Sequence, residues 1–415
     1  MTLFWANSEN NTQLSYDELV AELNKRKKRH PTVYTEDPSE VFIEILLAIL
    51  TNSELTLLDS EFSEETLDSI GYDSSVGSET KLLSGVDIAD EQELVSQIED
   101  ANDQWTLTLY TSGTTGTPTP VNQTFENLTR SVRREPRFSE HVWAFAYNPT
   151  HFAGLQVFFQ AIMNKNPIVY IFEYSPDEIG ELIEKHGITH ISSTPTFYRL
   201  RLQQLTGGYE TVSRLTSGGE KFEPSLKSSL QETFPNAKFR NVYAITEAGS
   251  LLESDGELFQ IPDELTDKVE ITEDSELIVH QSLLGESVSE DIDGEWFHTG
   301  DLVEFVSEDK FRFVGRESDF VNIGGYRVNP YEVEKHINSL EEIEAAVVAA
   351  RDSSVTGKIL VAEVQPVEGI DPDTAQKRVK DAISHLERWK QPRIIDTVDQ
   401  IEQSRSGKRI RGERQ

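Results

Sequence analysis

The chain has 415 residues, and its 73 acidic side chains outnumber 38 basic ones, which gives a formal net charge of −35. A surface this acidic repels polyanions and argues against a nucleic-acid-binding protein, while the absence of cysteine excludes disulfide scaffolds and thiolate metal sites. No apolar run reaches the ~20 residues that span a bilayer, and the first residues lack the basic and apolar regions of a signal peptide, so we expect a cytoplasmic protein without a membrane span.

The excess of carboxylates also predicts a halophilic protein. Self-repulsion on this scale destabilises a compact chain at low salt and is screened when the Debye length falls to ~3 Å near 1 M salt. An ordinary enzyme that is merely very acidic is the alternative.

The first hundred residues predict helices and one apolar strand. Residues 7–30 are expected to form a short helix that ends in the basic run 25–29, and residues 38–59 an apolar helix followed by a strand at 55–58. Residues 61–103 predict short helices and loops. The basic run could be a nucleic-acid or targeting signal, but in so acidic a chain a solvated helix face is the better interpretation.

From residue 105 onward, strands and helices alternate. Strands are predicted at 106–110, 142–147, 168–171, 189–192, 214–216 and 239–244, and helices at 127–133, 152–163, 175–186, 195–205 and 224–234. This alternation is typical of layered α/β sheets with mostly parallel pairing.

After about residue 271 the pattern changes to short strands separated by turns, at 277–280, 296–297, 302–305 and 311–314, which predicts a small β-rich subdomain. A helix at 331–338, strands at 345–350 and 359–365, and a helix at 374–386 follow. The fold class is therefore α/β, with a large N-terminal domain at 1–315 and a small α+β C-terminal domain at 316–415.

One loop carries a pattern suited to phosphate binding. Its glycines allow close backbone approach, and its hydroxyls and N–H groups can surround a phosphate chain; it comprises Thr111, Ser112, Gly113, Thr114, Thr115 and Gly116. It is predicted to follow a strand and precede a helix, which favours a phosphate site over a linker. It is not a Walker loop, because no Gly-Lys-Ser/Thr follows at the required spacing.

Four further segments accompany this loop in a fixed order, and together they resemble the adenylate-forming superfamily of acyl- and aryl-CoA synthetases, luciferases and peptide-synthetase adenylation domains. Residues 110–118 resemble the family's phosphate loop YTSGTTGxP. The others are similar to its YGxTE, WxxTGD, domain-joining and terminal-lysine motifs, at residues 243–247, 296–301, 315–334 and 406–408. The resemblance implies a mobile C-terminal domain.

The resemblance implies a role for each matching residue. Thr246 and Glu247 supply the hard oxygens that Mg²⁺ prefers beside ATP phosphates, and with Lys408 they form the expected catalytic set. Nucleotide contacts are expected from the phosphate loop and from Gly218, Gly219, Glu220, Tyr243, Asp301 and Arg316.

The acid and the thiol are expected to meet a second group of residues. His151, Phe152, Gly154 and Ser217 correspond to segments that border the acyl group, and Gly324 and Gly325 to the loop presented to the thiol. For His151, a core histidine is the alternative. The sequence departs from the family at Thr119, followed by Pro120, where the loop lysine is usual, and at Ser318 in the hinge.

The function implied is an ATP-dependent acid–thiol ligase. A small carboxylic acid is activated as an acyl-adenylate with ATP and Mg²⁺, and is then transferred to the thiol of CoA or of the phosphopantetheine of an acyl carrier protein. A non-catalytic nucleotide- or acyl-binding protein of the same fold is the alternative, supported only by the missing loop lysine.

Overall fold

The computed structural model describes residues 2–8, 12–73, 80–83, 85–100, 105–111, 118–222, 224–285, 292–323, 325–353 and 357–401. Contacts divide the chain into two compact units, the first made of Met1–Glu270 and Ile278–Thr299 and the second of Ile271–Leu277 and Gly300–Gln415. This division differs from the expected boundary at 315/316, which stays a prediction about where the C-terminal domain hinges.

The first unit contains an eight-stranded sheet. Its strands are β1 (Leu3–Asn7), β2 (Thr12–Ser15), β9 (Trp143–Phe145), β10 (Ile168–Tyr170), β11 (His190–Ser193), β12 (Arg214–Gly218), β13 (Lys238–Ile245) and β14 (Gly249–Ser254). They lie in the order β14-β13-β12-β11-β9-β10-β1-β2, with parallel pairing between all inner strands and antiparallel edges at β14 and β2. Parallel strands covered on both faces need apolar runs, and β9 and β10 are buried at every position.

A second sheet of the same unit has four strands in the order β4-β5-β7-β8. They are β4 (Thr32–Tyr34), β5 (Leu55–Leu58), β7 (Thr106–Thr111) and β8 (Thr119–Thr124), and β8 alone runs antiparallel to its neighbour. A short pair, β3 (Lys28–Arg29) with β6 (Lys81–Leu82), lies in the same part of the chain.

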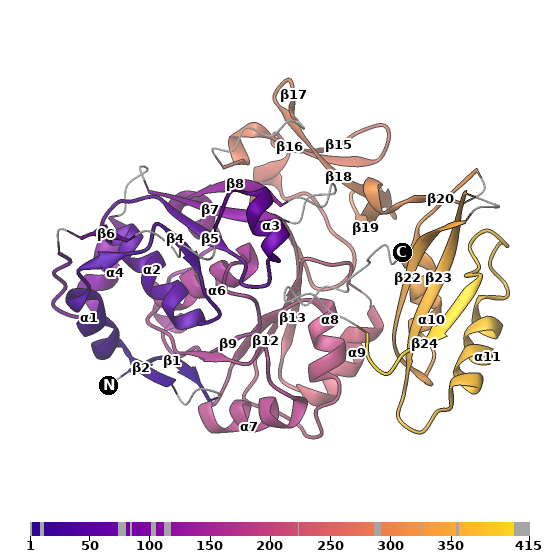
Figure 1. The fold of residues 1–415 in the computed structure, drawn as a ribbon, viewed down its shortest axis with the longest axis horizontal. Coiled ribbons are helices and arrows are strands. Elements are labelled where there is room, and N and C mark those ends of the chain that lie inside the picture. Colours follow the sequence, from indigo (N-terminus) through magenta and orange to yellow (C-terminus); the bar gives the residue numbers. More distant parts are fainter. Residues whose placement is uncertain are drawn as a thin grey trace. The chain divides into compact units, whose positions relative to one another are not determined.

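Nine α-helices are assigned in the described residues of this unit. They are α1 (Tyr16–Lys25), α2 (Pro38–Leu50), α3 (Glu64–Ser69), α4 (Glu91–Glu99), α5 (Phe125–Thr129), α6 (Phe152–Ile162), α7 (Pro176–His186), α8 (Pro195–Phe197) and α9 (Pro224–Thr233), and a π-helical turn at Tyr198–Leu202 follows α8. Figure 1 shows α2 and α6 in the layer between the two sheets and α7 beyond the other face of the larger sheet. The layered α/β architecture expected from the sequence is confirmed.

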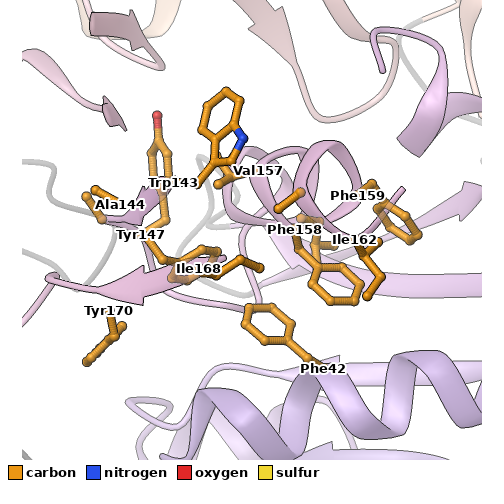
Figure 2. Close-up of a cluster of buried hydrophobic side chains, with 14 of the residues drawn as sticks. Phe42, Trp143, Ala144, Tyr147, Val157, Phe158, Phe159, Ile162, Ile168 and Tyr170 are labelled. Atoms are coloured by element: carbon orange, nitrogen blue, oxygen red, sulfur yellow. The ribbon is translucent and has the colours of Figure 1, made fainter. Parts of the chain in front are cut away.

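The core lies where α2 and α6 pack between the sheets. Phe42 of α2 stacks on Phe158 of α6 with ring centroids 4.4 Å apart (Figure 2). The Phe42 ring also meets the Phe145 ring of β9 edge to face. Beyond Ser39 and Glu40 in its first turn, α2 is apolar around its whole circumference apart from Glu44, as a helix covered on all sides requires. Its start is set by Pro38 in the first turn and by Asp37, whose carboxylate accepts from the Ser39 N–H at 2.9 Å.

Two expectations about local structure in the first 130 residues are wrong. Residues 7–30 contain the end of β1, strand β2 and only then helix α1, because the chain's first strand pairs in parallel with β10. The segment after the phosphate loop is a strand, not a helix: Thr111 lies opposite Thr119, so the loop connects the antiparallel strands β7 and β8, and helix α5 begins only at Phe125. From Val121 onward, buried and more exposed residues alternate along β8. The sequence did not show this period of two, because Val121 is the only apolar side chain of the strand besides Pro120.

The β-rich part is a five-stranded sheet in the order β15-β16-β18-β17, with β19 paired to β18. Its strands are β15 (Val269–Ile271), β16 (Glu276–His280), β17 (Ile292–Asp293), β18 (Trp296–Phe305) and β19 (Phe311–Arg316). The two short strands expected at 296–297 and 302–305 are one continuous strand. Both β17 and β19 run antiparallel to it.

The second unit ends in an α+β fold. Strands β22 (Ile343–Ser353), β23 (Gly357–Pro366) and β24 (Ile394–Thr397) form a sheet that packs against α10 (Pro330–Asn338) and α11 (Pro372–Ile383), and β20 (Val321–Ile323) pairs with β21 (Tyr326–Val328). Its core is separate and aliphatic, with Val333, Ile337, Val364 and Val379 among its buried members. Within the described part of the chain, no helix has the length and apolarity needed to cross a membrane.

Candidate active site

The carboxyl ends of four parallel strands bring most of the expected site residues of the first unit to one edge. Neighbouring β9, β11, β12 and β13 run parallel, so the segments that follow them start at the same edge of the sheet. In open α/β sheets ligands bind at this edge. The segments are those that hold Asn148 to His151, Thr194, Ser217 to Glu220, and Tyr243 to Glu247.

The end of β12 and the loop after it pack closely against β13 because they are built of small residues. Gly218 pairs with Val242 of β13, and a Cβ on Gly218 would lie 3.1 Å from the Val242 carbonyl oxygen. Gly219 has φ +79°, which a glycine adopts without strain. Beside them the Ser217 side chain is fully buried, and its Oγ has no hydrogen-bond partner among the described residues. A buried polar atom of this kind is suited to a ligand or water.

Glu220 has a structural contact in addition to its expected role. Its Oε2 accepts from the backbone N–H of Thr196 at 3.0 Å and from the Thr196 hydroxyl at 2.6 Å. This carboxylate therefore ties the β12 loop to the first turn of α8. A contact between Glu220 and the nucleotide stays a prediction.

Thr246 and Glu247 occupy the turn between β13 and β14. Two distant residues hold the backbone of this turn: the Thr246 carbonyl accepts from the Gln123 amide at 2.6 Å, and the Glu247 carbonyl accepts from the Gly285 N–H at 2.9 Å. Both side chains stay half-buried. A hydroxyl and a carboxylate at this edge fit a hard cation such as Mg²⁺, which binds few protein oxygens and completes its shell with water and substrate phosphates.

The segment before α6 contains the expected acid-side residues. His151 is the N-cap residue of α6, but its ring does not cap the helix; Nε2 lies 3.6 Å from Oδ2 of Asp59. The side chain of His151 is 37% exposed, so the alternative of a core histidine is wrong. Asn148 precedes it and donates to the other oxygen of Asp59 at 3.1 Å.

Gly154 and Phe152 fit tightly beneath this segment. A Cβ on Gly154 would lie 2.8 Å from the Asn148 carbonyl oxygen and 3.1 Å from the Phe145 ring. The Phe152 side chain is only 7% exposed, and its ring fills the space beside Gly249, which has φ +75°. In this structure both residues pack; direct contact with the acid stays a prediction for them.

In the second unit, Asp301 and Arg316 lie opposite each other on β18 and β19. Arg316 Nε donates to Asp301 Oδ1 at 3.0 Å, and the Asp301 side chain is largely buried. A carboxylate held by a guanidinium has a defined orientation, which suits the binding of ribose hydroxyls. The Gly325 N–H donates to Asn322 Oδ1 at 2.8 Å in the β20–β21 turn.

Several expected residues lie outside the described residues: Ser112, Gly113, Thr114, Thr115, Gly116, Gly324 and Lys408. The side chain of Thr111 is likewise not described. Their roles stay predictions from the motifs.

Sequence reasoning missed three residues that organise this edge. Asp59, Gln123 and Thr196 each hold a segment that carries an expected site residue. A polar residue directly after a buried strand was a usable signal for Asp59, since β5 ends at Leu58. No local signal marked the others, because their partners are distant in sequence.

The chain is similar to known proteins over most of its length. The sequence model described as "AMP-binding enzyme" matches residues 40–270, and that described as "AMP-binding enzyme C-terminal domain" matches residues 332–408. The chain is 27% identical over 355 residues to a 2-succinylbenzoate–CoA ligase of Listeria innocua, covering 79% of this chain and 74% of the relative. It is 24% identical over 456 residues to the ligase of the same name from Oceanobacillus iheyensis, covering 96% and 91%.

Solved structures show the same fold. The o-succinylbenzoate CoA synthetase of Bacillus subtilis in complex with its acyl-adenylate intermediate superposes with a TM-score of 0.70 at 18% identity, covering 99% of this chain and 94% of that one. ATP-bound MatB from Rhodopseudomonas palustris gives 0.71 at 18% identity, covering 98% and 94%.

The fold and the site define an adenylate-forming enzyme with a large α/β unit and a small C-terminal unit. The chain belongs to the AMP-binding enzyme family. The resemblance drawn from the five motifs is thereby confirmed, and so is the assignment, at the level of the family, to ATP-dependent acid–thiol ligases.

Proposed function

We propose that this protein joins 2-succinylbenzoate, or an aromatic acid closely similar to it, to CoA at the expense of ATP. Relatives that are 24–27% identical include 2-succinylbenzoate–CoA ligases of several bacteria, which supports this acid over the short and long aliphatic acids. The observation that carries the adenylation step is the fixed turn of Thr246 and Glu247 at the carboxyl edge.

The reaction has two steps. A carboxylate oxygen of the acid attacks the α-phosphorus of ATP, the bond to the β-phosphate oxygen breaks, and pyrophosphate leaves. The thiol, after losing its proton, then attacks the carbonyl carbon of the acyl-adenylate, and AMP leaves with the carbon–oxygen bond's electron pair.

Each residue has a role in this proposal. Thr246 and Glu247 would hold Mg²⁺, which neutralises charge on the phosphates. Asp301 binds the ribose hydroxyls with Arg316 beside it, Tyr243 lies against adenine, and Lys408 stabilises charge that develops at the α-phosphate. The phosphate loop binds the pyrophosphate end through N–H groups and hydroxyls, without the usual lysine at Thr119.

The acid would lie among His151, Phe152, Gly154 and Ser217, and the thiol would approach past Gly324 and Gly325 after the C-terminal domain, residues 316–415, rotates. CoA is the proposed acceptor, as for the ligases named above. Nothing supports phosphopantetheine on a carrier protein. A salt-rich cytoplasm is the proposed setting, because the net charge of −35 needs screening.

Pyrophosphate exchange with ATP tests the first step. The purified protein is given 2-succinylbenzoate, benzoate, succinate, butyrate or palmitate, and exchange is measured for each with and without Mg²⁺. We expect exchange that depends on Mg²⁺ and is fastest with 2-succinylbenzoate. Absence of exchange with every one of these acids would favour the non-catalytic alternative, and preference for another acid would overturn the proposed substrate.

Lys408→Ala tests the division of labour. We expect this variant to lose exchange but to make thioester from a supplied acyl-adenylate at nearly the normal rate. Equal loss of both half-reactions would contradict the role proposed for Lys408. CoA and pantetheine are compared as thiols in the same assay.

A further inference from the structure

Asp59 connects the second sheet to the segment in front of α6. It follows directly after the carboxyl end of β5, and its carboxylate reaches a residue 89 positions further along the chain. Oδ1 accepts from the Glu61 N–H at 3.0 Å and from Nδ2 of Asn148 at 3.1 Å. Oδ2 lies 3.6 Å from Nε2 of His151. One carboxylate therefore contacts both ends of the four-residue segment 148–151.

This carboxylate is charged at neutral pH. The Asp59 side chain is only 17% exposed, and burial alone would raise its pKa. The imidazole of His151, the Glu61 N–H and the Asn148 amide outweigh burial, so the pKa of Asp59 lies below its ordinary value. A negative charge that is partly withdrawn from water orients a neighbouring polar ring strongly.

The position of the His151 ring depends on this contact. His151 has the extended backbone of an N-cap residue, yet its side chain accepts no hydrogen bond from the first turn of α6. The ring faces Asp59 instead, and a neutral imidazole beside a carboxylate carries its proton on the facing nitrogen. This orientation favours the tautomer with the proton on Nε2, in which the Nδ1 lone pair is directed away from Asp59.

The other end of the segment is fixed through Asn148. Its Oδ1 accepts from both the backbone N–H and the hydroxyl of Thr150, at 2.9 and 2.8 Å. Since the Asn148 amide nitrogen is held by Asp59, the amide cannot turn over without losing all three contacts.

We infer that Asp59 is a positioning residue for acid binding: it fixes the segment 148–151 and sets the orientation and tautomer of His151. This inference rests on the proposed function, in which His151 borders the acid. It assigns to Asp59 no contact with the substrate.

A double-mutant cycle tests the inference through activity. Asp59→Asn keeps an oxygen acceptor for Glu61 and Asn148 but removes the charge that faces His151. We expect Asp59→Asn and His151→Gln each to raise the KM for the acid about ten-fold while the KM for ATP changes less than about two-fold, and the double variant to be no worse than His151→Gln alone. Additive effects, or equal changes in both KM values, would overturn the inference. Asp90→Asn, at the exposed N-cap of α4, is the matched control.

A second measurement needs no activity. In ¹⁵N-histidine-labelled protein the nitrogen chemical shifts report the tautomer of each ring, and His151→Gln assigns the His151 signals. We expect protonated Nε2 in the unchanged protein and loss of that pattern in Asp59→Asn, because an amide N–H next to the ring needs an acceptor there. An unchanged pattern would overturn the inference, whereas absent pyrophosphate exchange with a changed pattern would contradict only the proposed function.

Discussion

The side-chain amide of Gln123 donates a hydrogen bond to the backbone carbonyl of Thr246, with 2.6 Å between the two atoms. Gln123 is fully buried on β8, the strand that follows the phosphate loop, and Thr246 lies in the turn proposed to hold Mg²⁺. This contact joins two motifs that are 123 residues apart in the chain. It keeps the metal-side turn in a fixed place relative to the strand that leads out of the loop.

Gln123→Leu should therefore impair adenylation. The substitution has a similar volume but leaves the Thr246 carbonyl without its donor, which costs on the order of 1–3 kcal/mol in a buried setting. We expect pyrophosphate exchange to fall about ten-fold or more, since ~1.4 kcal/mol is one decade, with a larger effect on the KM for ATP than for the acid. The control is Asn122→Ala on the exposed face of the same strand, which should change neither value.

Gly154→Ala should destabilise the segment 148–151. The new methyl group would lie 2.8 Å from the Asn148 carbonyl oxygen and 3.2 Å from Cβ of Tyr147. Neither atom can move away unless the backbone of residues 147–148 shifts. Overpacking of this kind costs typically 1–3 kcal/mol. We expect a lower thermal midpoint and weaker acid binding. Gly208→Ala, where a Cβ meets open space, should alter neither, and a harmless Gly154→Ala would show that α6 can shift.

Glu44 should make stability depend on pH. It is fully buried in α2, and burial raises its pKa to about 7. Its Oε2 accepts from the His30 N–H at 2.9 Å, which offsets part of this rise. Its Oε1 has no hydrogen-bond partner among the described residues. The folded protein therefore binds more protons than the unfolded chain between about pH 4.5 and 7, so the free energy of unfolding falls as pH rises through this window.

Glu44→Gln removes this ionisation. Relative to the unchanged protein, the variant should gain roughly 2–3 kcal/mol in the free energy of unfolding between pH 5 and pH 8. Denaturant unfolding at both pH values measures the difference, with exposed Glu65→Gln as the control. A stability difference that stays constant with pH would mean that Glu44 does not change protonation on folding.

Salt should raise the thermal midpoint. With a net charge of −35, repulsion between carboxylates weakens the folded state, and the Debye length falls from ~10 Å at 0.1 M to ~3 Å at 1 M. We expect the midpoint to rise by roughly 10 °C or more between 0.1 and 2 M KCl, and further in potassium sulfate, which also strengthens apolar burial. A flat profile would leave an ordinary acidic enzyme as the explanation.

Local patterns in the sequence predicted many elements and the expected motifs. Helix α2 and strand β5 lie where the apolar run and the following strand were expected, and α7 lies where a helix was expected at 175–186. These features depend on residues within a few positions of one another, through side-chain period, proline placement and capping. The same is true of the five motifs, one of which contains Thr246 and Glu247; their order along the chain pointed to the family.

Only the tertiary structure decided which residues hold the site together. Three features need a partner from elsewhere in the chain: the pairing of β8 after the phosphate loop, the contacts of Asp59 with Asn148 and His151, and the hydrogen bond from Gln123 to Thr246. Local propensity cannot report such contacts, because a buried amide or carboxylate is stable only when a second segment brings the matching donor or acceptor. The sequence by itself determined the chemistry of the loops, and the packing of two sheets around α2 and α6 determined how those loops are positioned.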